Sequence, residues 1–348
     1  MSKMPSIEQF RHIVKTVKMQ SDFAGFDENE KPIYIRKNKY PIVKAIGTVK
    51  IHGTNASIGY KPRKGMWCQS KKNVITIEKD NAGFAAFVKA RQDFFETTIK
   101  YLCAAFCNED ETLILFGEFA GKGIQKGVAI SEIEKSFFIF GIRITDKDGD
   151  SSWVSNKNFV KVFVNWENNN TNTYILPFIK TYEVEIDFNA PEKANNEITD
   201  LVMQVEEECP VGKYFGISGI GEGIVFKFEY NGNIYLFKAK GDKHSKTKVK
   251  KVQHIDTAII DKCREVAGKV TPSWRLEQMY DETFDTLNGG KGDIKKTGDY
   301  IRSVIKDVLK EETDLVKEAG IAFKDLNKYV SGIAKDYLFA KLDEEAGL

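Results

Sequence analysis

VKIHGTN, at residues 49–55, is the stretch of this sequence that decides the fold. The residues before Lys50, YPIVKAIGTV, have the apolar and β-branched composition of a strand, and His52-Gly53 marks a turn directly after it. Gly53 lets the backbone of the turn approach a ligand closely, because glycine has no side chain. The stretch therefore predicts an amine at the end of a strand, beside a ligand site.

Two carboxylates occupy comparable positions further along the chain. LFGEFAGKGIQKG at 115–127 brings Glu118 from a strand into a glycine-rich loop, and EGIVFK at 222–227 places Glu222 at the start of another strand. Two inward carboxylates repel each other unless a metal ion or a lysine lies between them. These motifs therefore predict a site at which carboxylates and cations meet.

The strand motif FKAK, at 237–240, supplies two of those cations. Lys238 and Lys240 alternate with Ala239, so their side chains point to the same face of the strand. Lysines beside an aromatic run are costly unless they meet solvent or an anion, and a nucleotide phosphate is a natural anion. Lysines and carboxylates in one cleft are typical of metal-assisted phosphoryl transfer.

Each motif alone is weak evidence for a ligand site, because each also fits an ordinary structural role. FKAK by itself is more typical of a half-exposed edge strand, and a lysine run is usually a solvated loop. GISGIGEG at 216–223 resembles a phosphate-binding loop, but it lacks the Gly-Lys-Ser/Thr ending and does not begin a helix. Cys103 and Cys107 lie one helical turn apart, yet no further His or Cys pair completes a metal site.

Length and composition indicate a globular protein with two domains. The 348 residues are 42% hydrophobic and 29% charged. No apolar run is long enough to cross a membrane, and the N-terminus lacks a signal peptide, so we expect a cytoplasmic location. The net charge is only +2, but residues 241–251 hold five lysines and one aspartate. Such a local basic segment suits a polyanionic partner.

The order of elements divides the chain at about residue 248. The apolar spacing predicts helices at 7–19 and 80–107. Strands are expected at about 32–60, 112–119, 136–144, 222–230 and 233–240. An Asn231-Gly232 turn joins the last two strands. After the lysine-rich stretch the sequence is charged and helical in period. We therefore expect a mixed α+β domain at 1–248 and a small all-helical domain at 249–348.

Five motifs of this chain resemble, in their order, the motifs of the covalent nucleotidyltransferase superfamily. They are KIHGTN, FGEFAGKGIQKG, FFIFGI, EGIVFK and FKAK. Within this superfamily, the chain resembles the phage-type RNA ligase 2 family of ATP-dependent RNA ligases along its whole length. The resemblance implies an ATP-grasp-like nucleotidyltransferase domain of antiparallel sheets with flanking helices, followed by a helical domain. It implies that the enzyme uses ATP with Mg²⁺ or Mn²⁺, and the phage-type family makes a phage or virus a candidate source. A monomer is the default expectation.

The resemblance also implies a role for each matching residue. Lys50 would take up AMP as a phosphoramidate, which then passes to an RNA 5′-phosphate before the 3′-hydroxyl of the neighbouring strand displaces AMP. The expected substrate is nicked duplex RNA, or an RNA–DNA hybrid with an RNA 3′ end. The catalytic residues would be Lys50, His52, Glu118, Glu222, Lys238 and Lys240, with Glu222 binding the metal. The ATP site would comprise Val49, Lys50, Ile51, Asn55, Lys71, Glu118, Phe140, Lys227, Lys238 and Lys240.

The chain departs from the family at the basic position after the nucleophile motif. Arginine is common there, whereas this chain offers Lys71 or Lys72, of which we choose Lys71; lysine lacks the bidentate fork of arginine. The segment before Lys50 is also longer than the family pattern. The alternatives are an ATP-dependent DNA ligase or a capping-type guanylyltransferase, each usually with a C-terminal β-barrel, and a non-catalytic RNA-binding module.

Overall fold

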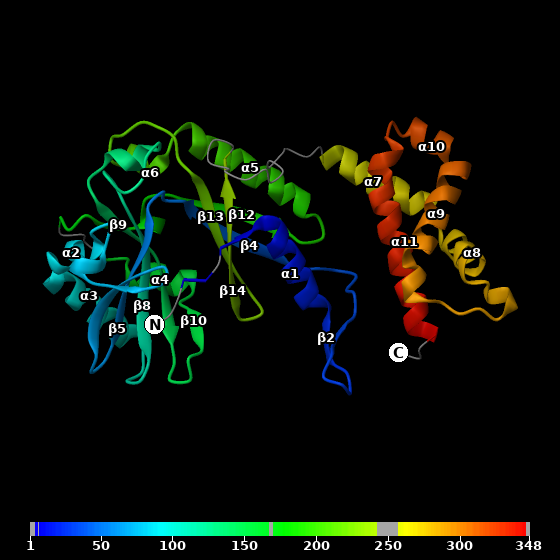
Figure 1. Ribbon diagram of the computed structural model, residues 1–348. Coiled ribbons are helices and arrows are strands. Elements are labelled where there is room, and N and C mark those ends of the chain that lie inside the picture. Colours follow the sequence, from blue (N-terminus) through cyan, green and yellow to red (C-terminus); the bar gives the residue numbers. More distant parts are fainter. Residues whose placement is uncertain (1–3, 6, 167–169, 242–256, 346–348) are drawn as a thin grey trace. The chain divides into compact units, whose positions relative to one another are not determined.

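The chain forms two compact units, Met1–Ile255 and Asp256–Leu348, in a computed structural model (Figure 1). The structure describes residues 4–5, 7–166, 170–241 and 257–345. Residues 242–256, which include the expected boundary at 248 and most of the lysine-rich stretch, lie outside the described residues. No helix within the described ranges combines the length and the hydropathy needed to cross a membrane.

A five-stranded sheet, in the order β1-β14-β13-β4-β12, carries three of the sequence motifs. Its strands are β1 (Glu8–Gln9), β4 (Ile42–Val49), β12 (Thr181–Asp187), β13 (Gly223–Tyr230) and β14 (Asn233–Lys240). The turn between β13 and β14 has positive φ at both Asn231 and Gly232, as the sequence predicts. Hairpin pairing sets Gly223 opposite Lys240, so the start of β13 and the end of β14 lie at one end of the sheet.

A second sheet of seven strands brings Glu118 and Phe140 to the same unit. Its order is β10-β9-β8-β5-β6-β7, with β11 pairing β9. All its pairs are antiparallel except β11 with β9. The strands are β5 (Thr54–Lys61), β6 (Gly65–Ser70), β7 (Val74–Ile75), β8 (Thr112–Ala120), β9 (Ser136–Thr145), β10 (Ser151–Trp153) and β11 (Thr173–Ile175).

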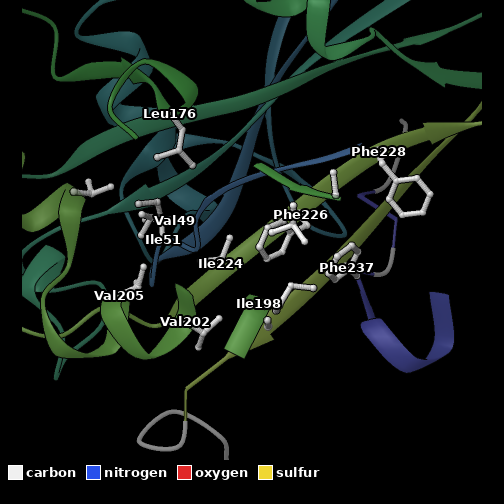
Figure 2. Packing of buried hydrophobic residues seen from close by; sticks show 14 of the residues in the cluster. Val49, Ile51, Leu176, Ile198, Val202, Val205, Ile224, Phe226, Phe228 and Phe237 are labelled. Carbon is white, nitrogen blue, oxygen red and sulfur yellow. The ribbon is translucent and has the colours of Figure 1, made fainter. Parts of the chain in front are cut away.

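Helices cover both sheets and close two separate cores. The core of the five-stranded sheet includes Phe226 and Phe237, whose rings stack at 5.1 Å, and α5 (Pro191–Glu207) packs Ile198 and Val202 against it (Figure 2). The core of the seven-stranded sheet is rich in phenylalanine and is covered by helices α2 (Phe84–Lys89) and α3 (Gln92–Phe106). The remaining helices of this unit are α1 (Phe10–Asp22), α4 (Asn156–Val162), α6 (Pro210–Tyr214), and the 3₁₀ turns η1 (Ile77–Lys79), η2 (Ala129–Glu132) and η3 (Leu176–Phe178).

The first helix begins later than its apolar spacing predicts. Ile13 and Val17 are buried in α1 as expected, but the helix starts at Phe10 and excludes Ile7. Glu8 and Gln9 instead pair in parallel with Phe237 and Lys238 at the edge of the five-stranded sheet. Backbone hydrogen bonding to an open sheet edge therefore outweighs the helical spacing of this short segment.

The second unit is all-helical in its described part, as expected. It consists of α7 (Thr257–Val270), α8 (Ser273–Phe284), α9 (Thr297–Glu311), α10 (Thr313–Glu318) and α11 (Phe323–Glu345), with short 3₁₀ turns at Thr286–Asn288 and Ile294–Lys296. Tyr300, Val304 and Val308 on α9 are fully buried in its own core. The α+β class, with antiparallel-rich sheets and a helical C-terminal region, is confirmed.

Candidate active site

A pocket of about 700 Å³ lies between the two sheets of the first unit. The five-stranded sheet contributes residues of β4, β12, β13 and β14, and the seven-stranded sheet contributes Asn55, Glu118 and Phe140 from β5, β8 and β9. A cavity of this size is in the range that small-molecule ligands occupy. Ten of the predicted site residues line it: Val49, Lys50, Ile51, Asn55, Lys71, Glu118, Phe140, Lys227, Lys238 and Lys240.

Glu222 is the centre of the charges at one end of the pocket. Its carboxylate accepts from Lys50 Nζ at 2.7 Å and lies 2.5 Å from Lys240 Nζ. Nδ1 of His52 is 3.1 Å from the same carboxylate. Burial alone would raise the pKa of Glu222, but the charges of Lys50 and Lys240 outweigh it and lower the pKa to about 2. Glu222 is therefore a permanent anion that holds the Lys50 amine.

Backbone geometry explains why these groups meet. The Lys50 N–H donates to the carbonyl of Gly223 at 2.8 Å, which ties the end of β4 to the start of β13. A side chain at Gly53 would lie 2.3 Å from the carbonyl oxygen of Phe119, so the turn after Lys50 requires glycine for close approach to β8. Gly223 has a φ of +142° and faces the backbone of Ala239 in the same way.

Lys238 and Lys240 project toward the pocket from one face of β14, as the alternation predicts. Phe237 and Ala239, which alternate with the two lysines, are buried on the opposite face. Burial lowers the pKa of Lys238, and the charges of Lys240, Lys50 and Lys71 lower it further. Lys71 lines the pocket. The four lysines line the same pocket, and Lys50, Lys71 and Lys240 act on Lys238 through their charges, so the pocket is suited to an anion.

Glu118 lies on the seven-stranded side of the pocket. Burial raises its pKa to about 7, the charge of Lys50 acts against this, and the charge of Glu222 adds to it. The expected lysine between the two carboxylates is thus Lys50, which bonds to Glu222 and acts on Glu118 through its charge. Asn55, paired with Glu118 across β5 and β8, has a buried Oδ1 atom with no hydrogen-bond partner in the part of the chain that the structure describes.

Apolar groups and one buried lysine form the rest of the pocket. Phe140 lies on β9, and Val49 and Ile51 flank Lys50 in the core. Lys227, on β13, is 8% exposed; its Nζ lies 5.9 Å from the centre of the Phe159 ring and has no hydrogen-bond partner among the described residues. Burial lowers the pKa of Lys227 to about 8. A buried ammonium without a hydrogen-bond acceptor is costly, so this lysine is suited to a polar ligand atom.

Several pocket residues were not found by motif analysis. Leu176, Pro177 and Phe178 come from η3, and Asn156 and Lys157 from α4. The segment 150–215 has no motif that resembles a ligand site, and Leu-Pro-Phe alone is typical of an ordinary turn. Only the packing of η3 beside β4 and β9 reveals these residues as part of the wall.

The charged residues Arg275 and Asp307 in the helical unit form an ion pair with each other. Arg275 is 4% exposed, and its Nε lies 2.9 Å from Asp307. Its guanidinium also donates to Glu312 at 2.8 Å and to the carbonyl of Val270. This arrangement joins α7, α8 and the end of α9.

Comparison with known proteins identifies the family. A model described as RNA ligase matches residues 43–240, more than half of the 348 residues. Among solved structures, the chain is similar to a lysine-to-methionine mutant of Naegleria gruberi RNA ligase with AMP and Mn, at 16% identity and a TM-score of 0.44. It is also similar to Naegleria gruberi RNA ligase with PPi, at 17% identity and a TM-score of 0.43. Both matches cover 70% of this chain and 57% of the other, so the chain spans a little over half of those proteins. Because the family model covers most of the first unit and more than half of the sequence, the chain belongs to the RNA ligase family.

Proposed function

We propose that this protein is an ATP-dependent RNA ligase that joins a 3′-hydroxyl to a 5′-phosphate through a lysyl-AMP intermediate on Lys50. The observation that carries the proposal is the Lys50 amine, held 2.7 Å from Glu222 at the mouth of a pocket that also contains Lys238 and Lys240. Family membership supports ligation of RNA as the overall reaction.

In the first step, Lys50 Nζ attacks the α-phosphorus of ATP. A nitrogen–phosphorus bond forms, the bond from that phosphorus to the bridging oxygen breaks, and pyrophosphate leaves. The amine must lose a proton, which passes to water, because Glu222, with a pKa of about 2, is a poor acceptor. Glu222 therefore orients the amine, while Lys71, Lys238 and Lys240 surround the place where phosphate charge develops.

The other predicted residues bind the nucleoside. We assign stacking on adenine to Phe140 and contact with the ribose to Glu118, which both line the pocket from neighbouring strands of the seven-stranded sheet. The unpartnered Oδ1 of Asn55 and Nζ of Lys227 are an acceptor and a donor available to the nucleotide. Val49 and Ile51 fix the backbone on each side of Lys50, because both are buried.

A divalent cation, Mg²⁺ or Mn²⁺, is the proposed cofactor, with Glu222 as its protein ligand. Among the described residues, no group of three or more His, Cys, Asp or Glu side chains forms a metal cage. One carboxylate beside a phosphate site nevertheless fits Mg²⁺, which is commonly held by one or two carboxylates, water and substrate phosphates. The ion would neutralise charge on the phosphates. One of the similar Naegleria gruberi RNA ligase structures contains ATP and Mn.

The later steps require RNA. AMP moves from Lys50 to the 5′-phosphate of an RNA end, and the 3′-hydroxyl of the neighbouring end then displaces AMP to form the phosphodiester. We propose nicked duplex RNA, or a hybrid with RNA at the 3′ end, as the preferred substrate, and a monomer as the active form. His52, 3.1 Å from Glu222, is assigned to the positioning of that carboxylate.

Label transfer from α-labelled ATP tests the nucleophile. The Lys50→Ala protein should lose all acid-labile adduct, and the Lys44→Ala protein, changed at an exposed lysine of the same strand, should keep it. An acid-labile adduct on the Lys50→Ala protein would refute the assignment.

Sealing of nicked RNA, hybrid and DNA duplexes with ATP or GTP tests the proposed substrates. Preference for a DNA 3′-hydroxyl or for GTP would refute the proposal of an ATP-dependent RNA ligase.

A further inference from the structure

The N-terminal arm, which we define as the β2–β3 hairpin and the segment after it, residues 23–42, exposes an unusual amount of apolar surface. The hairpin consists of β2 (Phe23–Phe26) and β3 (Pro32–Tyr34), and in Figure 1 it extends from the end of α1. Of the 20 exposed large hydrophobic side chains among the described residues, six belong to this arm: Phe23, Phe26, Ile33, Tyr34, Ile35 and Ile42. The arm precedes residue 43, where the family match begins.

Three aromatic rings gather on the hairpin. Phe23 pairs with Tyr34 across the two strands, with ring centroids 6.0 Å apart, and Phe26 lies 5.3 Å from Phe23. Their exposed fractions are 42% for Phe23, 66% for Phe26 and 50% for Tyr34. Exposed aromatic rings held on a short hairpin provide a preformed surface for stacking, since little side-chain freedom remains to be lost on binding.

The hairpin is anchored at its base, although two strands alone are only marginally stable. Asp22, at the end of α1, accepts from the Lys37 N–H at 2.9 Å, and the carbonyl of Asp22 accepts from the Ile35 N–H at 2.6 Å. The Tyr40 hydroxyl donates to the other carboxylate oxygen of Asp22. These bonds hold the arm in place while its aromatic rings remain exposed.

Positive charge lies beside the aromatic rings. From Lys31 to Lys44 the sequence contains five basic residues and no acidic residue. Lys44 pairs with Glu183, whereas the ammonium groups of Lys37 and Lys39 form no ion pair within the described part of the chain. Both line a surface groove of about 710 Å³, whose other side includes Tyr230.

The acidic residues of the arm, Asp27, Glu28 and Glu30, lie in the hairpin turn and do not line the groove. Asp27 accepts from the N–H groups of Asn29 and Lys31 at 2.8 Å each. The lining of the groove includes Lys37 and Lys39 and no acidic residue among the described ones, so its charge is positive, which suits a polyanion.

We infer that the N-terminal arm binds the RNA substrate away from the break, with Lys37 and Lys39 on backbone phosphates and the aromatic rings against bases or sugars. This inference rests on the proposed function. Tyr230, on the groove wall, ends β13, and Glu222 precedes the first residue of that strand. Eight residues of strand place the groove about 25 Å from Glu222. RNA whose end occupies the pocket reaches the arm only through its flanking nucleotides.

The test compares paired variants of the full chain on nicked duplex RNA. Lys37→Ala with Lys39→Ala should weaken RNA binding about tenfold at 0.1 M salt and reduce the slope of log affinity against log salt by one to two. Phe26→Ala with Tyr34→Ala should weaken binding about tenfold or more with little change in that slope. Label uptake from α-labelled ATP should equal that of the unchanged protein in both.

Matched controls lie elsewhere in the same unit. The control for the lysines is the double variant Lys100→Ala with Lys147→Ala, which changes two exposed lysines. The control for the aromatic rings is Tyr101→Ala, which changes a tyrosine that is 59% exposed. Tyr101 lies on α3, and Figure 1 places α3 far from β2. These controls should bind RNA as the unchanged protein does. The inference is overturned if the arm variants bind RNA normally, or if they only abolish self-association of the protein. Absence of label uptake in the unchanged protein would instead refute the proposed function, while the binding comparison still tests the arm.

Discussion

Glu222 in the first unit and Arg275 in the helical unit are both buried charges with several partners, yet they serve different purposes. Glu222 is 3% exposed and is surrounded by Lys50, Lys240 and His52. Arg275 is 4% exposed and bonds to Asp307, Glu312 and a backbone carbonyl. Burial and partner number therefore do not distinguish the two sites.

The difference lies in what surrounds the partners. Lys50 and Lys240 line a pocket, and each comes from a separate strand end, so a ligand can displace or reorient their bonds. The partners of Arg275 lie on α9 or at its end, and the guanidinium binds the last carbonyl of α7. A buried charge next to a cavity suits chemistry, whereas one that closes the ends of packed helices contributes mainly to stability.

The largest effect is expected for Glu222→Gln, which keeps the shape of the side chain and removes its charge. Formation of lysyl-AMP should fall about 10³-fold, because the Lys50 amine loses its orienting anion. The free energy of unfolding should change by less than about 2 kcal/mol, since Lys50 and Lys240 can turn to solvent. Label uptake and urea unfolding measure the two quantities, and activity within tenfold of normal would contradict the assignment.

Arg275→Met should show the opposite pattern. It should lower the free energy of unfolding by about 2–3 kcal/mol, because Asp307 and Glu312 lose their shared cation while remaining partly buried. Label uptake at low temperature should stay within twofold of normal. Arg302→Met is the control, because its pair with Asp299 is exposed and contributes little. Loss of label uptake with unchanged unfolding would mean that Arg275 has a functional role.

Lys227→Met should stabilise the protein while weakening its affinity for ATP. The folded-state pKa of Lys227, about 8, lies below its ordinary value of 10.5. Below pH 8 the lysine is charged in both states, so the full cost of burying the ammonium is present. At pH 7 the methionine variant should gain about 2 kcal/mol, and this gain should shrink between pH 8 and pH 10.5. Thermal unfolding across that range measures it, and a loss of stability at pH 7 would contradict the prediction.

Glu118→Gln should give a smaller effect with the opposite dependence on pH. The folded-state pKa of about 7 lies above the ordinary value of 4.5, so the unfolded chain releases the proton first as pH rises. The stability of the unchanged protein is therefore lost between about pH 4.5 and pH 7. The glutamine variant should gain about 1–2 kcal/mol at pH 8 and almost nothing near pH 4.5. A constant difference across this range would show that ionisation of Glu118 is not its cause.

Local patterns predicted most of the strands that form the site. The alternation in FKAK correctly set Lys238 and Lys240 on one face, and Asn231-Gly232 correctly marked the hairpin that sets Gly223 opposite Lys240. These are properties of neighbouring residues, so they can be read from the chain. The start of α1 was wrong because the pairing of Glu8 and Gln9 depends on β14, more than 200 residues away.

The sequence by itself determined the types of side chain available for chemistry, the strands that present them and the charge of the N-terminal arm. Only the tertiary structure decided that Lys50 bonds to Glu222 and acts on Glu118 through its charge. It also decided that Lys227 has no hydrogen-bond partner among the described residues and that Arg275 pairs within the helical unit. The physical reason is that strand and turn preferences act over a few residues, whereas burial and charge pairing depend on which distant segments meet.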